Sequence, residues 1–96
     1  MRKVLAFDFG ASSGRSVLGS FDGDRISYRE VHRFENIPVQ DGDRLAWDFF
    51  AIVHEIERTV DQYPDVDALA FDTWGVDYGL IGPDNLLTSL PTNYRD

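Results

Sequence analysis

The stretch from Asp8 to Arg15, Asp-Phe-Gly-Ala-Ser-Ser-Gly-Arg, holds the densest set of residues with a chemical use. A phosphate group is bound by backbone N–H groups that approach its oxygens, by hydroxyl donors, and by a cation that offsets its charge. These groups come, in that order, from Gly10 and Gly14, Ser12 and Ser13, and Arg15. We therefore expect a phosphate-binding turn, the alternative being a Gly- and Ser-rich turn with an exposed arginine. It is not a Walker loop, because no lysine follows its second glycine.

Asp8 adds a carboxylate at the end of the apolar run that precedes this turn. A carboxylate in that place can hold a hydrated Mg²⁺, directly or through the waters of the ion, against the β and γ oxygens of a nucleotide. A strand-ending aspartate beside such a turn is unusual for a purely structural turn. Asp8 is thus the expected metal-binding residue.

A second group of functional residue types, Asp72-Thr73-Trp74-Gly75-Val76-Asp77, follows another apolar run. Trp74 offers an apolar ring face to the C–H face of a sugar, and Gly75 lets a hydroxyl approach the backbone. If the two apolar runs are neighbouring strands, Asp8 and Asp72 reach one cleft, where ligands of open α/β sheets bind. We expect one site. The alternative leaves Trp74 in the core and Asp72 as a cap or turn residue.

Three strands are predicted before any helix. Residues 3–9 form a short apolar strand and residues 15–21 a second strand. Asp22-Gly23-Asp24 then favours a hairpin with a type I′ turn, because Asp-Gly tolerates positive φ. The third strand, residues 25–34, alternates in polarity. Its expected common face consists of Ile26, Tyr28, His32 and Phe34.

A loop, a helix and a further strand are predicted next. Residues 35–44 show no hydrophobic period, so we expect a loop there. Asp48 is placed to cap a helix that Pro64 ends, and the apolar positions between them recur at three and four residues. These positions are Phe49, Ile52, Val53, Ile56, Val60 and Tyr63. Residues 68–71 form a continuous apolar run, which is typical of a strand buried on both faces.

A final hairpin is predicted from residues 76–81 and 86–90, which flank Gly82-Pro83-Asp84-Asn85. The whole order is β-β-β-α-β plus an appended hairpin. It predicts an α/β fold that opens like a ribonuclease-H-like or actin-like ATPase sheet, with an antiparallel meander and a helix that crosses over to a parallel strand. Ninety-six residues allow one small domain, and the lack of a terminating element indicates a partial one.

The composition argues against several classes of partner and site. A net charge of −8 disfavours nucleic acid and membrane surfaces. Without cysteine, neither a disulfide framework nor a thiolate metal site is possible. No apolar run has the length of a membrane span or of a signal peptide, so we expect a cytoplasmic protein. His32 and His54 lie on different elements with no partner at metal-ligand spacing, so we expect both to be structural or solvated.

Together, these motifs resemble those of the FGGY carbohydrate kinases, and within them the L-rhamnulokinase branch. Asp8 to Arg15 resembles the first phosphate motif of that branch, and Asp72 to Gly79 resembles its sugar-side strand and turn. Leu90 to Asp96 is similar to the segment that returns to the pocket. His32-Arg33-Phe34 and Trp47-Asp48 also stand where the branch has them. The resemblance covers essentially the whole chain, although the FGGY signature itself is absent.

The resemblance implies phosphoryl transfer from Mg·ATP to the primary hydroxyl of a ketose, L-rhamnulose, giving the 1-phosphate. It implies that Ala11 to Arg15 face the nucleotide phosphates, that the Gly75 backbone touches the sugar, and that Tyr94 stands against the sugar. It further implies that residues 1–96 are the N-terminal, incomplete part of a first domain. The catalytic base and the second domain then lie elsewhere, and this stretch alone is expected to be inactive.

Two alternatives remain. A ribonuclease-H-like metal-dependent nuclease uses a strand-one Asp, a helix Glu and a strand-four Asp, which Asp8, Glu55 or Glu57, and Asp72 could mimic. Against it, the turn after Asp8 has no purpose in a two-metal site, and the negative net charge lacks the basic surface that binds nucleic acid. The other alternative is a non-catalytic fragment that dimerises to bury the surface its missing part would cover.

Overall fold

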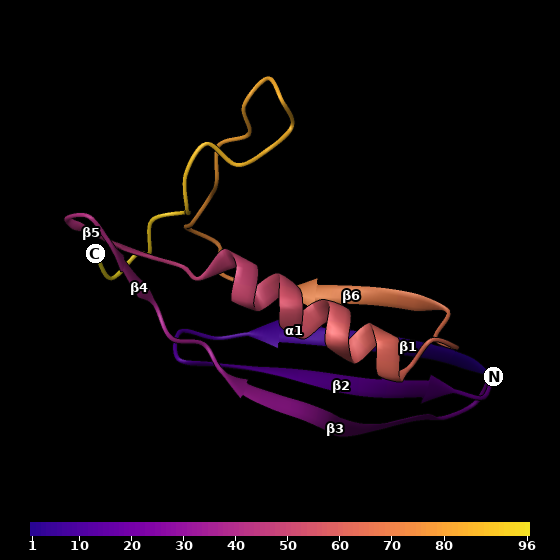
Figure 1. The fold of residues 1–96 in the computed structure, drawn as a ribbon. Helices are drawn as coiled ribbons and strands as arrows, with labels where there is room; N and C mark the ends of the chain where they lie inside the picture. The colour runs from indigo at the N-terminus through magenta and orange to yellow at the C-terminus, as the bar shows by residue number, and fades with distance from the viewer.

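The chain forms a four-stranded sheet with one helix along one face, in a computed structural model that describes residues 1–96 (Figure 1). The elements are β1 (Arg2–Phe9), β2 (Ser13–Phe21), β3 (Ile26–Glu35), β4 (Val39–Asp41), β5 (Arg44–Ala46), α1 (Phe49–Gln62) and β6 (Ala68–Asp72). The sheet order is β3-β2-β1-β6, with β1 antiparallel to β2, β2 antiparallel to β3, and β1 parallel to β6. The predicted meander, helix and parallel strand are confirmed, so the fold is mixed α/β.

Alternate residues of β1 build the core between the sheet and the helix. Leu5, Phe7 and Phe9 are buried together with Ile52 of α1, because side chains two apart on a strand share a face. Phe7 also stacks on Phe71 of β6, with ring centroids 5.2 Å apart. This packing brings the carboxyl ends of β1 and β6 to the same end of the sheet as the start of α1 (Figure 1).

The helix begins and ends at its predicted signals. The Asp48 side chain accepts a hydrogen bond from the Ala51 backbone N–H at 3.3 Å, as an N-cap does. α1 ends at Gln62, just before Pro64, which cannot continue a helix. No helix of the chain is long and apolar enough to cross a membrane.

The second face of the sheet carries no helix, and a bulge decides which side chains of β3 reach it. Ser16 of β2 is opposite His32, whereas the next residue, Val17, is opposite Glu30. Val31 is therefore an extra residue in β3. One extra residue moves every side chain beyond it to the other face of the strand.

The bulge makes one prediction wrong, namely that Ile26, Tyr28, His32 and Phe34 share a face. Ile26 and Tyr28 lie on the open face and are 73% and 77% exposed. His32 and Phe34 lie on the helix face, where Phe34 packs against the core. The alternating pattern alone does not reveal an inserted residue, because the strand is polar on both sides of Val31.

Two predicted connections also differ. Residues 35–44, expected to be a loop, contain β4 and the start of β5, and the turn between these strands uses the positive φ of Gly42, 63°. The turn at Asp22-Gly23-Asp24 forms, but only Gly23 has a positive φ, at 97°. A type I′ turn needs two such residues, so the type I′ prediction is wrong.

The predicted final hairpin forms no pair of strands. Ile81 and Leu87 make a single isolated bridge, and Leu80, Ile81 and Leu86 are each more than 60% exposed. A two-stranded ladder with no layer to cover it is at best marginally stable. Residues 73–96, called below the C-terminal segment, are therefore irregular and project beyond the end of the sheet (Figure 1).

Candidate functional site

The turn between β1 and β2, residues 10–13, presents free backbone donors at its tip. The Gly10 N–H donates to the Ser13 carbonyl at 2.8 Å and closes the turn. The N–H groups of Ala11 and Ser12, at the centre of the turn, donate to no atom of the chain. Ser12 is exposed and brings a hydroxyl to the same tip. Free N–H groups of successive residues are what an anion such as phosphate binds.

Gly14, directly after the turn, is a packing requirement. The residue is buried and lies under the ring of Phe34, and a Cβ at position 14 would overlap that ring. Gly14 therefore holds the base of the turn close to β3, and its φ is not positive. The sequence motif pointed to this glycine as a backbone phosphate ligand, and the structure adds a steric reason for its presence.

Asn36 is a residue of this turn that the sequence did not single out. Its backbone N–H donates to the Ser12 carbonyl at 3.0 Å, and its side-chain Nδ2 donates to the Gly10 carbonyl at 3.0 Å. Asn36 is only 3% exposed. It follows β3 and lies 26 residues from Gly10 along the chain, so no local pattern could have indicated the contact.

Asp8 and Asp72 are paired positions of two neighbouring parallel strands, as the strand order predicted. Neighbouring strands lie about 4.8 Å apart, and residues in register point to the same face. Asp8 is opposite Arg15 of β2, and the Arg15 Nε donates to Asp8 Oδ2 at 3.1 Å. The Nη1 of Arg15 is also 4.0 Å from Glu30.

These side chains border a cavity on the open face of the sheet. Asp8, Arg15 and Asp72 line it together with apolar residues of the strands, and its volume is about 400 Å³. The side chains of Asp8 and Arg15 are 48% and 47% exposed, so water screens their ion pair and either group can exchange its partner for a ligand. No residue of the β1–β2 turn lines this cavity, but Asp8 and Arg15, which do, stand two residues before and two residues after the turn in the chain.

Two carboxylates are enough to bind a hydrated Mg²⁺ but too few to bind a metal ion that has lost its waters. The chain has no group of three or more metal-ligating side chains. Mg²⁺ commonly keeps several waters and takes one or two carboxylates plus substrate phosphates. Asp8 and Asp72, side by side on the open face, match that requirement.

The same arrangement contradicts the nuclease alternative, which needs a helix carboxylate beside the two aspartates. The Glu55 carboxylate is hydrogen-bonded to His32 Nε2 at 2.5 Å on the helix face, the opposite side of the sheet from Asp8. Glu57 lies in a polar surface hollow with His54 and other residues of α1 alone. No carboxylate trio is assembled.

Trp74 packs onto another tryptophan. Its ring stacks on Trp47, with centroids 3.7 Å apart and an interplanar angle of 21°, and lies 6.2 Å from the ring of Phe9. Trp47 is 2% exposed, and its Nε1 donates to Asp77 at 2.5 Å. Trp74 borders an apolar cavity of about 270 Å³ beside α1. One face of Trp74 is therefore used in packing.

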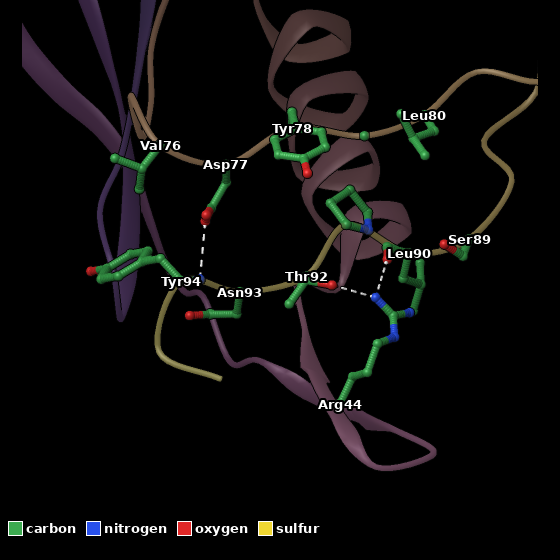
Figure 2. Close-up of a pocket in the computed structure, with 12 residues that line it drawn as sticks. Arg44, Val76, Asp77, Tyr78, Leu80, Ser89, Leu90, Thr92, Asn93 and Tyr94 are labelled. Carbon is green, nitrogen blue, oxygen red and sulfur yellow. Dashed lines mark hydrogen bonds between the residues drawn. The ribbon is translucent and has the colours of Figure 1, made fainter.

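Tyr94 borders a different cavity, of about 350 Å³, shown in Figure 2. Its backbone N–H donates to Asp77 at 3.4 Å, and its ring centroid is 6.1 Å from that of Trp47. On the other side of this cavity Arg44 donates to the Leu90 carbonyl and to the Thr92 hydroxyl, at 3.1 and 2.5 Å (Figure 2).

Three of the predicted substrate residues therefore line three separate cavities and not the one site that was expected. The cavities of Trp74 and Tyr94 share Asp77, whose carboxylate joins Trp47 to the Tyr94 backbone, whereas Asp72 lines the cavity of Asp8. Gly75 has open space around its Cα, since an added Cβ would meet nothing within 4 Å. Sequence reasoning missed Asp77 and Trp47 as joining residues, because their partners are distant in the chain.

Comparison with known proteins gives relatives over the whole chain. It is 36% identical over 99 residues to a rhamnulokinase of Bacteroides thetaiotaomicron and 40% identical over 103 residues to one of Lactiplantibacillus plantarum. A rhamnulokinase of Klebsiella pneumoniae is 37% identical over 102 residues. These matches cover 99% to 100% of the chain. No protein-family model matches it.

The chain spans about a fifth of the length of these relatives, 20% to 21%. The aligned length exceeds the 96 residues of the chain by a few positions, so the alignments contain only short gaps. The similarity therefore runs through both predicted motifs and the segment between them.

Proposed function

We propose that this chain is part of a rhamnulokinase-like carbohydrate kinase, to whose relatives it is 36% to 40% identical, and that the complete protein transfers a phosphoryl group from ATP to a ketose. The proposed sugar is L-rhamnulose, and the product is L-rhamnulose 1-phosphate. The sheet would be the opening part of a ribonuclease-H-like, actin-like ATPase domain. The observation that carries the proposal is the β1–β2 turn, whose two free N–H groups lie between Asp8 and Arg15 in the chain, while Asp8 and Arg15 line one cavity with Asp72.

The phosphates of ATP would lie against the tip of the turn. The N–H groups of Ala11 and Ser12 donate to phosphate oxygens, with the hydroxyls of Ser12 and Ser13 as further donors. Arg15 moves from Asp8 to the phosphates, which offer a stronger charge-assisted bond than a half-exposed carboxylate. Gly10 and Gly14 keep the backbone close to the oxygens.

Asp8, with Asp72 beside it, would hold hydrated Mg²⁺. When bound, the ion neutralises charge that develops on the phosphate oxygens. Releasing Arg15 from Asp8 leaves both oxygens of that carboxylate free for the ion or its waters. The two charges of the present ion pair thus have separate uses, one for the phosphates and one for the metal.

The sugar would lie toward the C-terminal segment. The open space at Gly75 lets a hydroxyl reach the backbone, and Tyr94 and the uncovered part of Trp74 offer aromatic surface to the C–H groups of the ring or chain. Asp72 lies between this side and the phosphate side. The base that accepts the hydroxyl proton is proposed to come from a part of the protein outside these 96 residues.

The test is substitution of Arg15 in the complete protein. Arg15→Ala removes the charge-assisted bond to phosphate, which should cost about 1.5–3 kcal/mol of transition-state stabilisation. The value of kcat/KM for ATP should therefore fall roughly 10- to 150-fold. Arg33→Ala is the matched control, because Arg33 is paired opposite Arg15 in the sheet but bonds to Glu30. An unchanged dependence on ATP in Arg15→Ala would reject the phosphate assignment.

The choice of sugar needs a separate measurement. A coupled assay of the complete protein with L-rhamnulose, fuculose and xylulose should give the highest kcat/KM with L-rhamnulose. A preference for another ketose would keep the kinase proposal and replace its substrate. No phosphorylation of any ketose would refute the proposal.

A further inference from the structure

Three of the four carbonyl groups of residues 10–13 are occupied, and the Ala11 carbonyl accepts from no atom of the chain. The Ser13 carbonyl accepts from Gly10, and the carbonyls of Gly10 and Ser12 both accept from Asn36. One residue thus binds two of the three carbonyls, one through its backbone and one through its side chain. The neighbouring N–H groups of Ala11 and Ser12 are left free.

This division matters for an anion. A peptide carbonyl carries a partial negative charge and repels phosphate, whereas an N–H attracts it. Each peptide unit carries both groups on opposite sides, so a carbonyl that is held against β3 turns its N–H toward the outside. The Gly10 carbonyl and the Ala11 N–H belong to one such unit. Holding that carbonyl inward therefore aims the Ala11 N–H at the tip.

The chemistry of the Asn36 side chain suits only this arrangement. Its Nδ2 is a donor, and the atom that it meets is an acceptor. An aspartate of the same shape would place a carboxylate oxygen against the Gly10 carbonyl, with no donor between them. At 3% exposure, water cannot easily replace the lost bond.

We propose that Asn36 is a positioning residue for phosphate binding: it holds the Gly10 and Ser12 carbonyls inward and so keeps the Ala11 N–H, which shares a peptide unit with the Gly10 carbonyl, directed at the nucleotide. The inference rests on the proposed function for its ligand. It adds a residue outside the motif, reached only through the fold. Asn36 itself touches no phosphate in this scheme.

The experiment compares Asn36→Asp and Asn36→Ala in the complete protein. Both should raise KM for ATP about 10-fold, as expected for a lost buried hydrogen bond, and Asn36→Asp should have the larger effect. The KM for the sugar should stay within about twofold, because the sugar-side contacts do not involve Asn36. Affinity for adenosine, which has no phosphate, should also be unchanged.

Thr59→Ala is the matched control for general destabilisation. Thr59 is 1% exposed, and its hydroxyl donates to the Glu55 carbonyl within α1, away from the turn. This variant loses one buried hydrogen bond and should keep the wild-type KM for ATP. If Thr59→Ala raised that KM as much as Asn36→Ala, or if adenosine affinity fell in parallel, Asn36 would have only a structural role.

A second measurement separates this inference from the proposed function. Amide hydrogen exchange of residues 10–13 without nucleotide should be faster in Asn36→Ala than in the wild type and in Thr59→Ala. Equal exchange would overturn the positioning role even in an active kinase. If the wild-type protein phosphorylates a sugar with ATP and the Asn36 variants have the wild-type KM for ATP, only this inference is refuted. If the wild-type protein does not use ATP at all, the proposed function is refuted.

Discussion

The two sides of the candidate site are held by different kinds of interaction. The proposed phosphate side lies at the end of a hydrogen-bonded ladder, in which β1 pairs with β2 over eight residues and with β6 over five. The C-terminal segment has no strand. It is held by the Trp47–Trp74 stack, by the bonds from Trp47 and Tyr94 to Asp77, and by two backbone hydrogen bonds, from the Trp47 N–H to the Pro91 carbonyl and from the Asn93 N–H to the Leu45 carbonyl. Many of its apolar side chains are exposed, including those of Val76, Tyr78 and Leu80.

The difference corresponds to what each side has to offer a ligand. Phosphate is bound by backbone N–H groups, whose directions a sheet register sets closely. A sugar is bound by aromatic faces and polar side chains, which can be brought together from separate loops. We therefore expect the sheet side to be stiff and the C-terminal segment to open locally. The following predictions test that contrast, in order of decreasing effect.

The largest effect is expected in the core beneath the phosphate side. Phe7 is 1% exposed and stacks on Phe71, so Phe7→Ala should lower the free energy of unfolding by about 3–5 kcal/mol. Urea unfolding measures it. Phe50→Ala is the control, because Phe50 is 69% exposed and its loss should cost less than about 0.5 kcal/mol. Similar losses in both variants would mean that the sheet is not the stable part.

A glycine on each side gives the next contrast. Gly14→Ala forces a methyl group into the Phe34 ring and should cost about 1–3 kcal/mol of stability. The methyl group added by Gly75→Ala meets no atom, so the free energy of unfolding should stay within about 0.5 kcal/mol of the wild-type value. The KM for the sugar should rise. Thermal unfolding and sugar kinetics measure the two effects. A Gly14→Ala protein as stable as wild type would show that Phe34 moves freely.

Loss of the Asp77 carboxylate should loosen only the C-terminal segment. Asp77→Ala leaves the buried Trp47 Nε1 without an acceptor, at a cost of about 1–3 kcal/mol. Amide exchange should rise in residues 76–96 while β1 keeps its protection. Asp43→Ala removes an exposed carboxylate as a control and should change neither region. Faster exchange in β1 would show that the two sides unfold as one unit.

The smallest effect is expected at the turn between β2 and β3, Asp22-Gly23-Asp24, at the opposite end of these strands from the β1–β2 turn. The backbone N–H of Arg25, and after it that of Asp24, hold the pKa of the Asp22 carboxyl below its ordinary value. A pKa lowered by folding stabilises the protein above the unfolded pKa of about 3.9, and the contribution is lost as the pH falls through the folded pKa. Asp22→Ala should thus be slightly less stable than wild type at pH 7 and equally stable near pH 2.

Thermal unfolding at the two pH values checks this, with Asp24→Ala as the control. The Asp24 side chain accepts no hydrogen bond from the turn, so Asp24→Ala controls for the effect of a substitution in the turn itself. A stability difference for Asp22→Ala that persists at pH 2 would come from the shape of the turn and not from the charge.

Short-range patterns in the sequence determined β1, β2, β3, α1 and β6, but not β4 and β5. Apolar runs, the Asp48 cap and Pro64 predicted the strands and the helix, because periodicity and capping act within a few residues. The order of elements then placed Asp8 beside Asp72, since a crossover helix joins parallel neighbours. The turn between β1 and β2 could be predicted because its residues are contiguous.

The tertiary structure alone decided which groups those elements bring together. The Val31 bulge, which reverses the face of Tyr28 relative to His32, depends on how β3 pairs with β2. The contacts of Asn36 with Gly10, and of Trp47 with Asp77, join residues 26 and 30 positions apart. These contacts stabilise the protein only after the sheet and the helix have packed together. Hydrogen bonds and stacking act over a few ångströms in space, and the linear order of residues does not state which distant groups come within that range.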